Sequence, residues 1–351
     1  MAHKVLAAVA TASTLLAMVA HADTAITENT TVGGKAFIDL TSLESKSNGT
    51  KTGASGFGLD VKRFYLVVNH TFDDLWSANL TTDFNYVSND PTKIGYTGET
   101  QLFIKKAYLQ AKLSNAFIVR AGSADLPWVA LVEEFYGYRF VEQVLLDRTK
   151  FGTSADWGVH AGGKLSDGMF GYAVSVVEGN GFRNPTRSKS LDTEARLSFT
   201  PVKGLTAAVG FYSGKLGKDV QGTATPAIHT ASRYDALLAY RNDKFKVGGE
   251  YFSANNWTAV TSATKDSANG YSVWGSIAFT DKVSGFVRYD NDKPNKDTAP
   301  TKKDEYYNIG VSTKVRKGVD IAVAYKHDEV KNNGVTATQY DELGVWAQVA
   351  F

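Results

Sequence analysis

The chain has 351 residues, a formal net charge of +2 and no cysteine. So small a charge argues against a nucleic-acid partner, which usually requires a basic surface, and the lack of cysteine excludes a disulfide framework or a thiolate metal site. Glycine (32), phenylalanine (19) and tyrosine (17) are frequent and proline (7) is scarce, a composition that does not point to an ordinary soluble domain.

The first 22 residues predict a secretory signal peptide. Lys4 supplies a positive start, residues 5–19 are rich in Ala, Val and Leu, and Ala20-His21-Ala22 offers a cleavage site before Asp23. A short membrane anchor or a buried helix is the alternative, but the run is shorter than the ~20 residues that span a bilayer. We therefore expect an exported chain with one mature domain, residues 23–351.

From residue 23 onward the sequence breaks into segments of about ten residues that alternate apolar and polar side chains, the pattern of a strand with two different faces. The last segment is the clearest, with Leu343, Val345, Ala347, Val349 and Phe351 in one phase. All the prolines fall outside these segments or at their ends, as a continuous hydrogen-bonded ladder requires. Sixteen segments are centred near residues 36, 65, 81, 107, 118, 160, 173, 196, 208, 237, 248, 275, 286, 310, 322 and 345.

The connections alternate between short and long. The short ones are 71–74, 114–115, 166–168, 201–204, 242–244, 281–282 and 316–318, and the long ones are 42–58, 88–100, 122–155, 178–190, 213–232, 254–270, 291–304 and 329–338. Transmembrane β-barrels show this sorting, with an even number of strands and both termini at the periplasmic end, whereas a soluble sandwich or propeller has no reason for it. We therefore predict an all-β, 16-stranded antiparallel transmembrane barrel, wide enough to leave an aqueous channel.

Two stretches and the C-terminus resemble a known family. Ala107-Tyr108-Leu109-Gln110 through Arg120-Ala121-Gly122, followed by Trp157-Gly158-Val159 through Glu178-Gly179-Asn180-Gly181, is similar to the phosphate-selective porins O and P, and Phe351 resembles the signal read by the barrel-assembly machinery. The resemblance implies an outer-membrane porin of a Gram-negative bacterium. It also implies a homotrimer that passes anions or small polar solutes.

The third long connection, residues 122–155, differs from the others because residues 126–146 are strongly apolar and aromatic. Exposing such a loop to water would cost ~25 cal/mol for each Å² of apolar surface. We expect it to fold inward and narrow the lumen as a constriction loop, as the third loop of porins does by resemblance. A subunit contact or a surface lid is the alternative.

Charged side chains at this constriction would set which ions pass. The candidate pore-lining residues are Lys35, Arg63, Lys106, Arg120, Arg196 and Arg288 on strands and Glu133, Glu134, Arg139 and Arg148 in the loop. Ordinary solvated residues of a polar lumen are the alternative for any one of them. The inward phase of all strands carries twelve bases and nine acids, which predicts a weak anion preference. The loop itself sums to −2, which departs from the basic loop expected of a dedicated phosphate pore.

Other functions are less well supported. Inward aromatic residues could stack on sugars, so a sugar-specific porin stays open, as does a plugged structural barrel. An outer-membrane enzyme would need a nucleophile with a base, but His70, His160, His229 and His327 accompany no Gly-x-Ser-x-Gly motif and no metal-spaced pair. We expect no enzyme, cofactor or metal, and partners limited to membrane lipid, lipopolysaccharide, the assembly machinery, further copies of the chain and small solutes.

Overall fold

The computed structural model describes residues 24–86 and 100–351, in which the strands form one antiparallel sheet. Sixteen long strands make a ring that closes where the last strand pairs with the first, β18 with β2. They are β2 (Thr30–Ser47), β4 (Gly56–Thr71), β5 (Trp76–Tyr86), β6 (Thr100–Ser114), β7 (Phe117–Asp125), β8 (Ala155–Leu165), β9 (Phe170–Val177), β10 (Asp192–Val202), β11 (Leu205–Gly214), β12 (Ala231–Arg241), β13 (Phe245–Asn255), β14 (Ser267–Ala278), β15 (Val283–Lys293), β16 (Lys303–Arg316), β17 (Val319–Asn332) and β18 (Val335–Ala350).

Two short strands, β1 (Thr24–Thr27) and β3 (Thr50–Lys51), pair with the two ends of β2, and a 3-10 turn, η1 (Ser166–Gly168), joins β8 to β9. Every expected strand centre falls inside one of the sixteen long strands, so the predicted barrel is confirmed. The predicted signal peptide, residues 1–22, lies outside the described residues, and so does nearly all of the expected connection 88–100.

Apolar side chains cover the outside of the ring. On β14, Val273 and Ile277 point outward and are exposed, whereas Ser272 and Trp274 point inward and are buried. The same alternation exposes Val287 and other aliphatic residues on neighbouring strands. A continuous apolar exterior of this size suits hydrocarbon and not water. In the described part of the chain, no helix is long and apolar enough to cross a membrane.

Aromatic side chains border this apolar band at both ends. Near the long connections, one row crosses six successive strands through the register pairs Phe211–Tyr234, Tyr251–Tyr271 and Tyr289–Tyr307. Near the short turns, Phe170, Phe199, Tyr240, Phe245 and Phe279 are exposed on the outside. Such girdles lie at the level of the lipid head groups at both interfaces. Short turns are periplasmic in outer-membrane barrels, which assigns the end with the short turns to the periplasm.

Two of the expected long connections are hairpins instead. Strand pairing continues into both segments: β2, β3 and β4 enter residues 42–58, and β17 and β18 enter residues 329–338. The reversals occur at Asn48-Gly49 and Asn333-Gly334. All four residues have positive φ, which is the requirement of a tight two-residue hairpin turn. Polar strands that extend beyond the membrane have the composition of loops, so the sequence pattern alone ends them too early.

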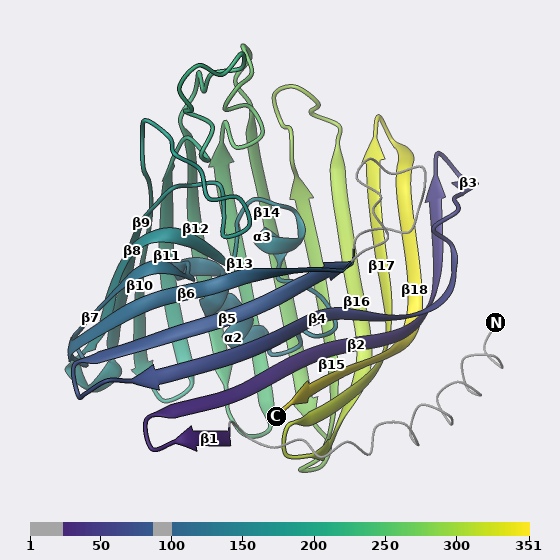
Figure 1. The fold of residues 1–351 in the computed structure, drawn as a ribbon. Coiled ribbons are helices and arrows are strands. Elements are labelled where there is room, and N and C mark those ends of the chain that lie inside the picture. The colour runs from purple at the N-terminus through teal and green to yellow at the C-terminus, as the bar shows by residue number, and fades with distance from the viewer. Residues whose placement is uncertain (1–23, 87–99) are drawn as a thin grey trace.

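The connection between β7 and β8 folds into the ring, as expected (Figure 1). It contains α2 (Pro127–Tyr136) and α3 (Leu145–Arg148). Trp128, Val132 and Leu146 are almost fully buried and pack with the inward-facing Phe252 and Trp274 of the barrel wall. Inward packing explains the apolar composition of this loop and contradicts a surface lid.

Candidate functional site

The lumen has two unlike walls. Bulky inward side chains of β13–β16 and β18, including Phe252, Trp274, Phe286 and Trp346, pack against the loop. Many inward positions of β8–β11 carry small residues instead, among them Gly162, Gly171, Ala173, Ser198 and Thr206. A cavity of about 1110 Å³ lies between the small-residue wall and α2. Residue size therefore fixes which side of the barrel the loop fills and which side it leaves open.

Basic side chains dominate the charges that line this cavity. They are Lys112, Arg120, Lys164, Arg196 and Arg241, against Asp125, Glu134 and Asp167. Two of the three acids are neutralised, because Asp125 pairs with Lys106 at 2.5 Å and Glu134 with Arg241 at 2.6 Å.

Arg120 and Arg196 are held without a carboxylate. The Nε of Arg120 donates to the side-chain carbonyl of Gln110 at 2.8 Å, and its guanidinium lies over the Tyr108 ring. The Nη1 of Arg196 donates to the backbone carbonyl of Pro127 at 2.7 Å, and its Nε has no partner. Among the ion pairs of residues 24–86 and 100–351, none involves Arg120, Arg196, Lys112 or Lys164. These bases carry positive charge that no ion pair offsets.

The acids of the loop are paired. Glu133 and Asp147 both contact Arg139, at 2.7 and 3.4 Å. Glu142 pairs with Lys326 of β17 at 3.1 Å. Burial by itself would raise the pKa of the Glu142 carboxyl, but the Lys326 ammonium and the N–H of Gln143 outweigh burial and lower that pKa to about 2. The net negative charge of the loop sequence is thus balanced by arginine and lysine side chains that pair with its acids.

One arginine ties the end of the loop to three strands. Arg148 contacts Asp290 of β15 at 3.2 Å, Asp304 of β16 at 3.0 Å and Asp328 of β17 at 3.0 Å. Beside it, Arg288 pairs with Asp290 and donates to the backbone carbonyl of Gln143. The Arg148 and Arg288 side chains are 8% and 1% exposed. The sequence placed both along the pore, whereas the structure places them in the contact between loop and wall.

The comparisons with known proteins agree with this geometry. The family model of the phosphate-selective porins O and P matches residues 31–351. The chain belongs to this family. It is therefore a porin, a channel of the outer membrane and not an enzyme. No curated protein sequence matches the chain.

Solved structures share the fold of this porin at low sequence identity. The outer membrane channel DcaP of Acinetobacter baumannii matches with a TM-score of 0.66 and 14% identity, covering 94% of this chain and 100% of that one. The anion-selective porin of Comamonas acidovorans gives 0.63 and 12%, covering 92% and 99%. OmpT of Vibrio cholerae gives 0.63 and 15%, covering 93% and 99%.

The remaining candidate residues of the porin lie on the wall formed by β2–β6. Lys35 is exposed on β2, and Arg63 pairs with Asp83 at 3.1 Å. β-bulges lie next to Arg63 and Lys106, because the register shifts between Phe37 and Ile38 and between Thr81 and Thr82. At a bulge two consecutive residues face the partner strand's single residue, which is why Lys62 and Lys105 also contact inward-facing residues.

The count of inward charges from the sequence therefore misses several charges of the porin, some beside these bulges and others toward the strand ends that meet the long connections. The missed bases are Lys62, Lys105 and Arg233, and the missed acids are Asp60, Asp156, Asp292, Asp304 and Asp328. More acids than bases were overlooked, so a simple count of inward charge does not support an anion preference. What distinguishes the inward charges is which of them have an ion-pair partner and which do not.

The inward aromatic residues expected to bind sugars are mostly committed to packing. Phe37, Phe252, Trp274, Phe286, Tyr306 and Trp346 are each at most 5% exposed. A buried ring offers no face on which a sugar can stack. The arrangement in the described residues gives the sugar-specific alternative little support.

His160 has a neighbour that sequence spacing could not reveal. Its Nδ1 lies 2.8 Å from the Ser175 hydroxyl, because β8 and β9 pair these two residues directly. Its Nε2 lies 3.3 Å from the Gly122 carbonyl, and both side chains are buried. A catalytic pair would need an accessible hydroxyl and a group that orients the base. No group of three or more potential metal ligands is found in residues 24–86 and 100–351.

Proposed function

We propose that small anions and other small hydrophilic solutes diffuse passively through the cavity beside α2, with a weak preference for anions. The residues that select are Arg120 and Arg196, supported by Lys112 and Lys164, and the inward-folded loop is the constriction. The single observation that carries the proposal is that these bases have no carboxylate partner while the loop acids around the cavity are paired.

The physical reason is the effect of fixed charge in a narrow aqueous passage. Unpaired bases lower the barrier for an anion and raise it for a cation. A paired acid presents little net field, because its counter-charge lies within about 3 Å of it. The preference is weak because Arg63, Lys106 and Arg241 are themselves paired with carboxylates. Phosphate is one candidate solute among small anions, and nothing in the lining favours it over the others.

The test is the reversal potential of the purified porin in a salt gradient across a planar bilayer. We expect a modest shift toward anion permeability. Replacing both cavity arginines, R120Q with R196Q, removes two positive charges, each worth about 1 kcal/mol at 4 Å even in bulk water. The anion-to-cation permeability ratio is expected to fall several-fold. K282Q is the matched control, because Lys282 is exposed in a periplasmic turn.

A clear cation preference of the unmodified porin contradicts the proposal. An unchanged permeability ratio in the double variant contradicts the assignment of Arg120 and Arg196 as selecting residues. Equal effects of K282Q and the double variant would mean that surface charge, and not the cavity, sets the selectivity.

We also infer a cleaved signal peptide at residues 1–22, a homotrimer, and contacts with lipopolysaccharide and the barrel-assembly machinery. The motif Ala20-His21-Ala22 supports the cleavage site, and the trimer form described for OmpT of Vibrio cholerae makes a trimer reasonable for this fold. The mass of the mature protein tests the first, with cleavage before Asp23 expected. Chemical cross-linking in native membranes tests the second, and a monomer alone would contradict it.

A further inference from the structure

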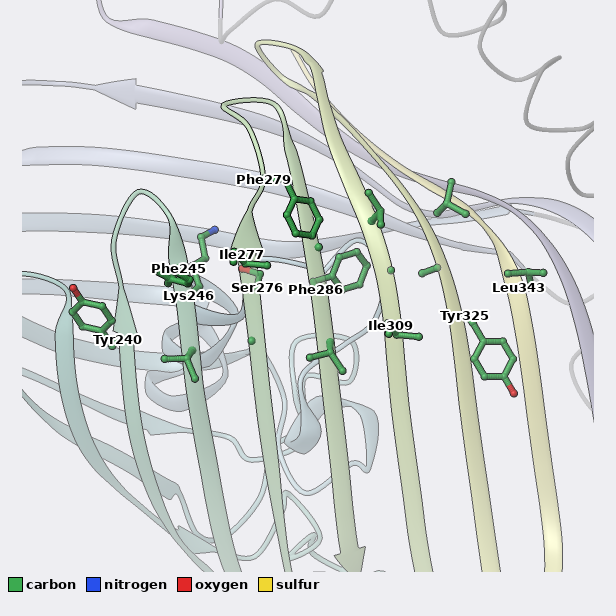
Figure 2. A pocket seen from close by; sticks show the side chains of 18 residues that line it. Tyr240, Phe245, Lys246, Ser276, Ile277, Phe279, Phe286, Ile309, Tyr325 and Leu343 are labelled. Carbon is green, nitrogen blue, oxygen red and sulfur yellow. The ribbon is translucent and has the colours of Figure 1, made fainter.

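An apolar groove of about 920 Å³ runs across the outside of the barrel, from β12 to β18. Figure 2 shows it from close by, with Phe245, Ile277 and Ile309 on strands and Phe279 in the turn that follows β14. Most of the side chains along it, such as Val247 and Ile309, belong to the exposed apolar band. The groove lies on the surface that faces lipid, so its position does not depend on which ions the lumen passes.

Two glycines on the outer face line the groove, and the first leaves an open gap. Gly275 of β14 is paired with Val247 of β13 on one side and with Val287 of β15 on the other. A Cβ at Gly275 would have only a backbone oxygen, at 3.8 Å, as a neighbour within 4 Å. The second glycine, Gly285, lies beneath the ring of Phe279. The result is a gap of one side chain over Gly275, between Val247 and Val287, floored by backbone.

Lysines border the periplasmic end of the groove. Lys244 and Lys282 are exposed in the turns that precede β13 and β15, and Arg316 and Lys317 are exposed in the next turn. Backbone hydrogen bonds join neighbouring turns and strands, because the N–H of Ala278 donates to Lys244 and that of Lys314 donates to Lys282. Only Asp243 and Asp281 oppose these bases in the three turns. The rim therefore carries a basic surplus.

We propose that this groove binds an anionic phospholipid of the periplasmic leaflet. One acyl chain lies over Gly275 between Val247 and Val287, and the phosphate lies at Lys244 and Lys282. An acyl chain matches an open groove with almost no polar lining, and the basic rim attracts a phosphate that carries negative charge. A second copy of the chain is the other possible occupant, but it would have to supply both a thin apolar ridge and an acidic edge.

The experiment measures lipid retained by the purified, detergent-solubilised mature porin, using native mass spectrometry. The porin is incubated with equal amounts of phosphatidylglycerol and phosphatidylcholine of the same acyl chains. G275L places a side chain in the groove at a position where a Cβ has only one neighbour within 4 Å, at 3.8 Å. A236L is the matched control, because Ala236 is an exposed outward residue of β12 that does not line the groove. A second variant, K244Q with K282Q, leaves the groove open and removes charge from its rim.

We expect the unmodified porin and A236L to retain phosphatidylglycerol in preference, and G275L to lose it. In the lysine variant the preference for the anionic lipid should fall roughly fivefold for each lysine removed. Heat-modifiable migration on a gel verifies that each variant is folded. Equal retention of both lipids by the unmodified porin overturns the proposal, as does full retention by folded G275L. A changed oligomeric state of G275L with unchanged lipid would assign the groove to a contact between copies.

Discussion

At the scale of the residue, Arg148 is the clearest anchor of the loop. Its guanidinium contacts carboxylates from three strands while it is almost buried. Replacing it by glutamine would leave these carboxylates facing each other without a counter-charge. Breaking a buried ion pair by removing one partner costs about 3 kcal/mol or more, equal to a roughly hundredfold rise in the released state.

R148Q should therefore make the open channel noisier. We expect frequent current steps in single-channel recordings as the loop leaves the wall and returns. R187Q is the control, because Arg187 is exposed in another connection. Recordings of R148Q as quiet as those of the unmodified porin would show that apolar packing alone holds the loop.

The ion pair between Glu142 and Lys326 predicts how this anchoring depends on pH. The pKa of Glu142 is lowered from the ordinary value of 4.5 to about 2 in the folded porin, so its contribution to stability is complete above 4.5 and is lost as pH falls through about 2. Between pH 7 and pH 5 the loop should not loosen through this group. E142Q removes the ion pair with Lys326, so its single-channel noise at pH 7 should exceed that of the unmodified porin. Single-channel noise in E142Q that equals the unmodified level at pH 7 would contradict the role of the pair.

At the scale of the element, α2 is fixed to the wall by its one tryptophan, Trp128. The Trp128 backbone N–H donates to Glu194 at 2.8 Å, its indole N–H donates to Glu250 at 3.1 Å, and its ring lies where a side chain on Gly210 would have to be. Only glycine leaves room for this contact. The identity of one wall residue therefore determines how close the helix can come to β11.

W128A should widen the lumen. Removing a buried tryptophan costs about 3–5 kcal/mol, and the buried Glu250 carboxylate loses the indole donor, so we expect α2 to detach and conductance to rise. W76A is a suitable control, because Trp76 is an exposed outward residue of β5. Unchanged conductance in folded W128A would mean that the rest of the loop holds α2 in place.

The strands, and the fact that the loop folds inward, could be predicted from the sequence, because both follow from where apolar side chains must go. Alternation placed Arg120 and Arg196 correctly on the inner face. The bulges beside Arg63 and Lys106 could not be predicted, because an added residue changes the phase without changing the composition. The contact of Arg148 with three strands was also beyond prediction, since it joins residues more than 140 positions apart.

At the scale of the whole molecule, the barrel depends on the seam between its last and first strands. Phe351 extends that seam, because its N–H donates to the carbonyl of Gly34 at 3.0 Å and its own carbonyl accepts from the Gly34 N–H at 2.7 Å. Its ring lies directly over Gly34 and beside Phe64, with 6.2 Å between the ring centres. In lipid no water can hydrogen-bond the free backbone N–H and C=O groups of an open strand edge. The last strand must therefore pair fully with the first along this seam.

Deleting Phe351 should therefore impair assembly by two routes, since it removes the expected recognition residue and one pair of seam hydrogen bonds. We expect less folded porin in the outer membrane, measured by heat-modifiable migration of membrane fractions. The two routes can be separated with F351A, which keeps the backbone pair but loses the ring. If F351A assembles normally in cells while the deletion does not, the backbone seam is the requirement. If both fail in cells yet refold equally well in detergent, the ring serves recognition. Normal levels of the deletion variant would leave Phe351 with neither role.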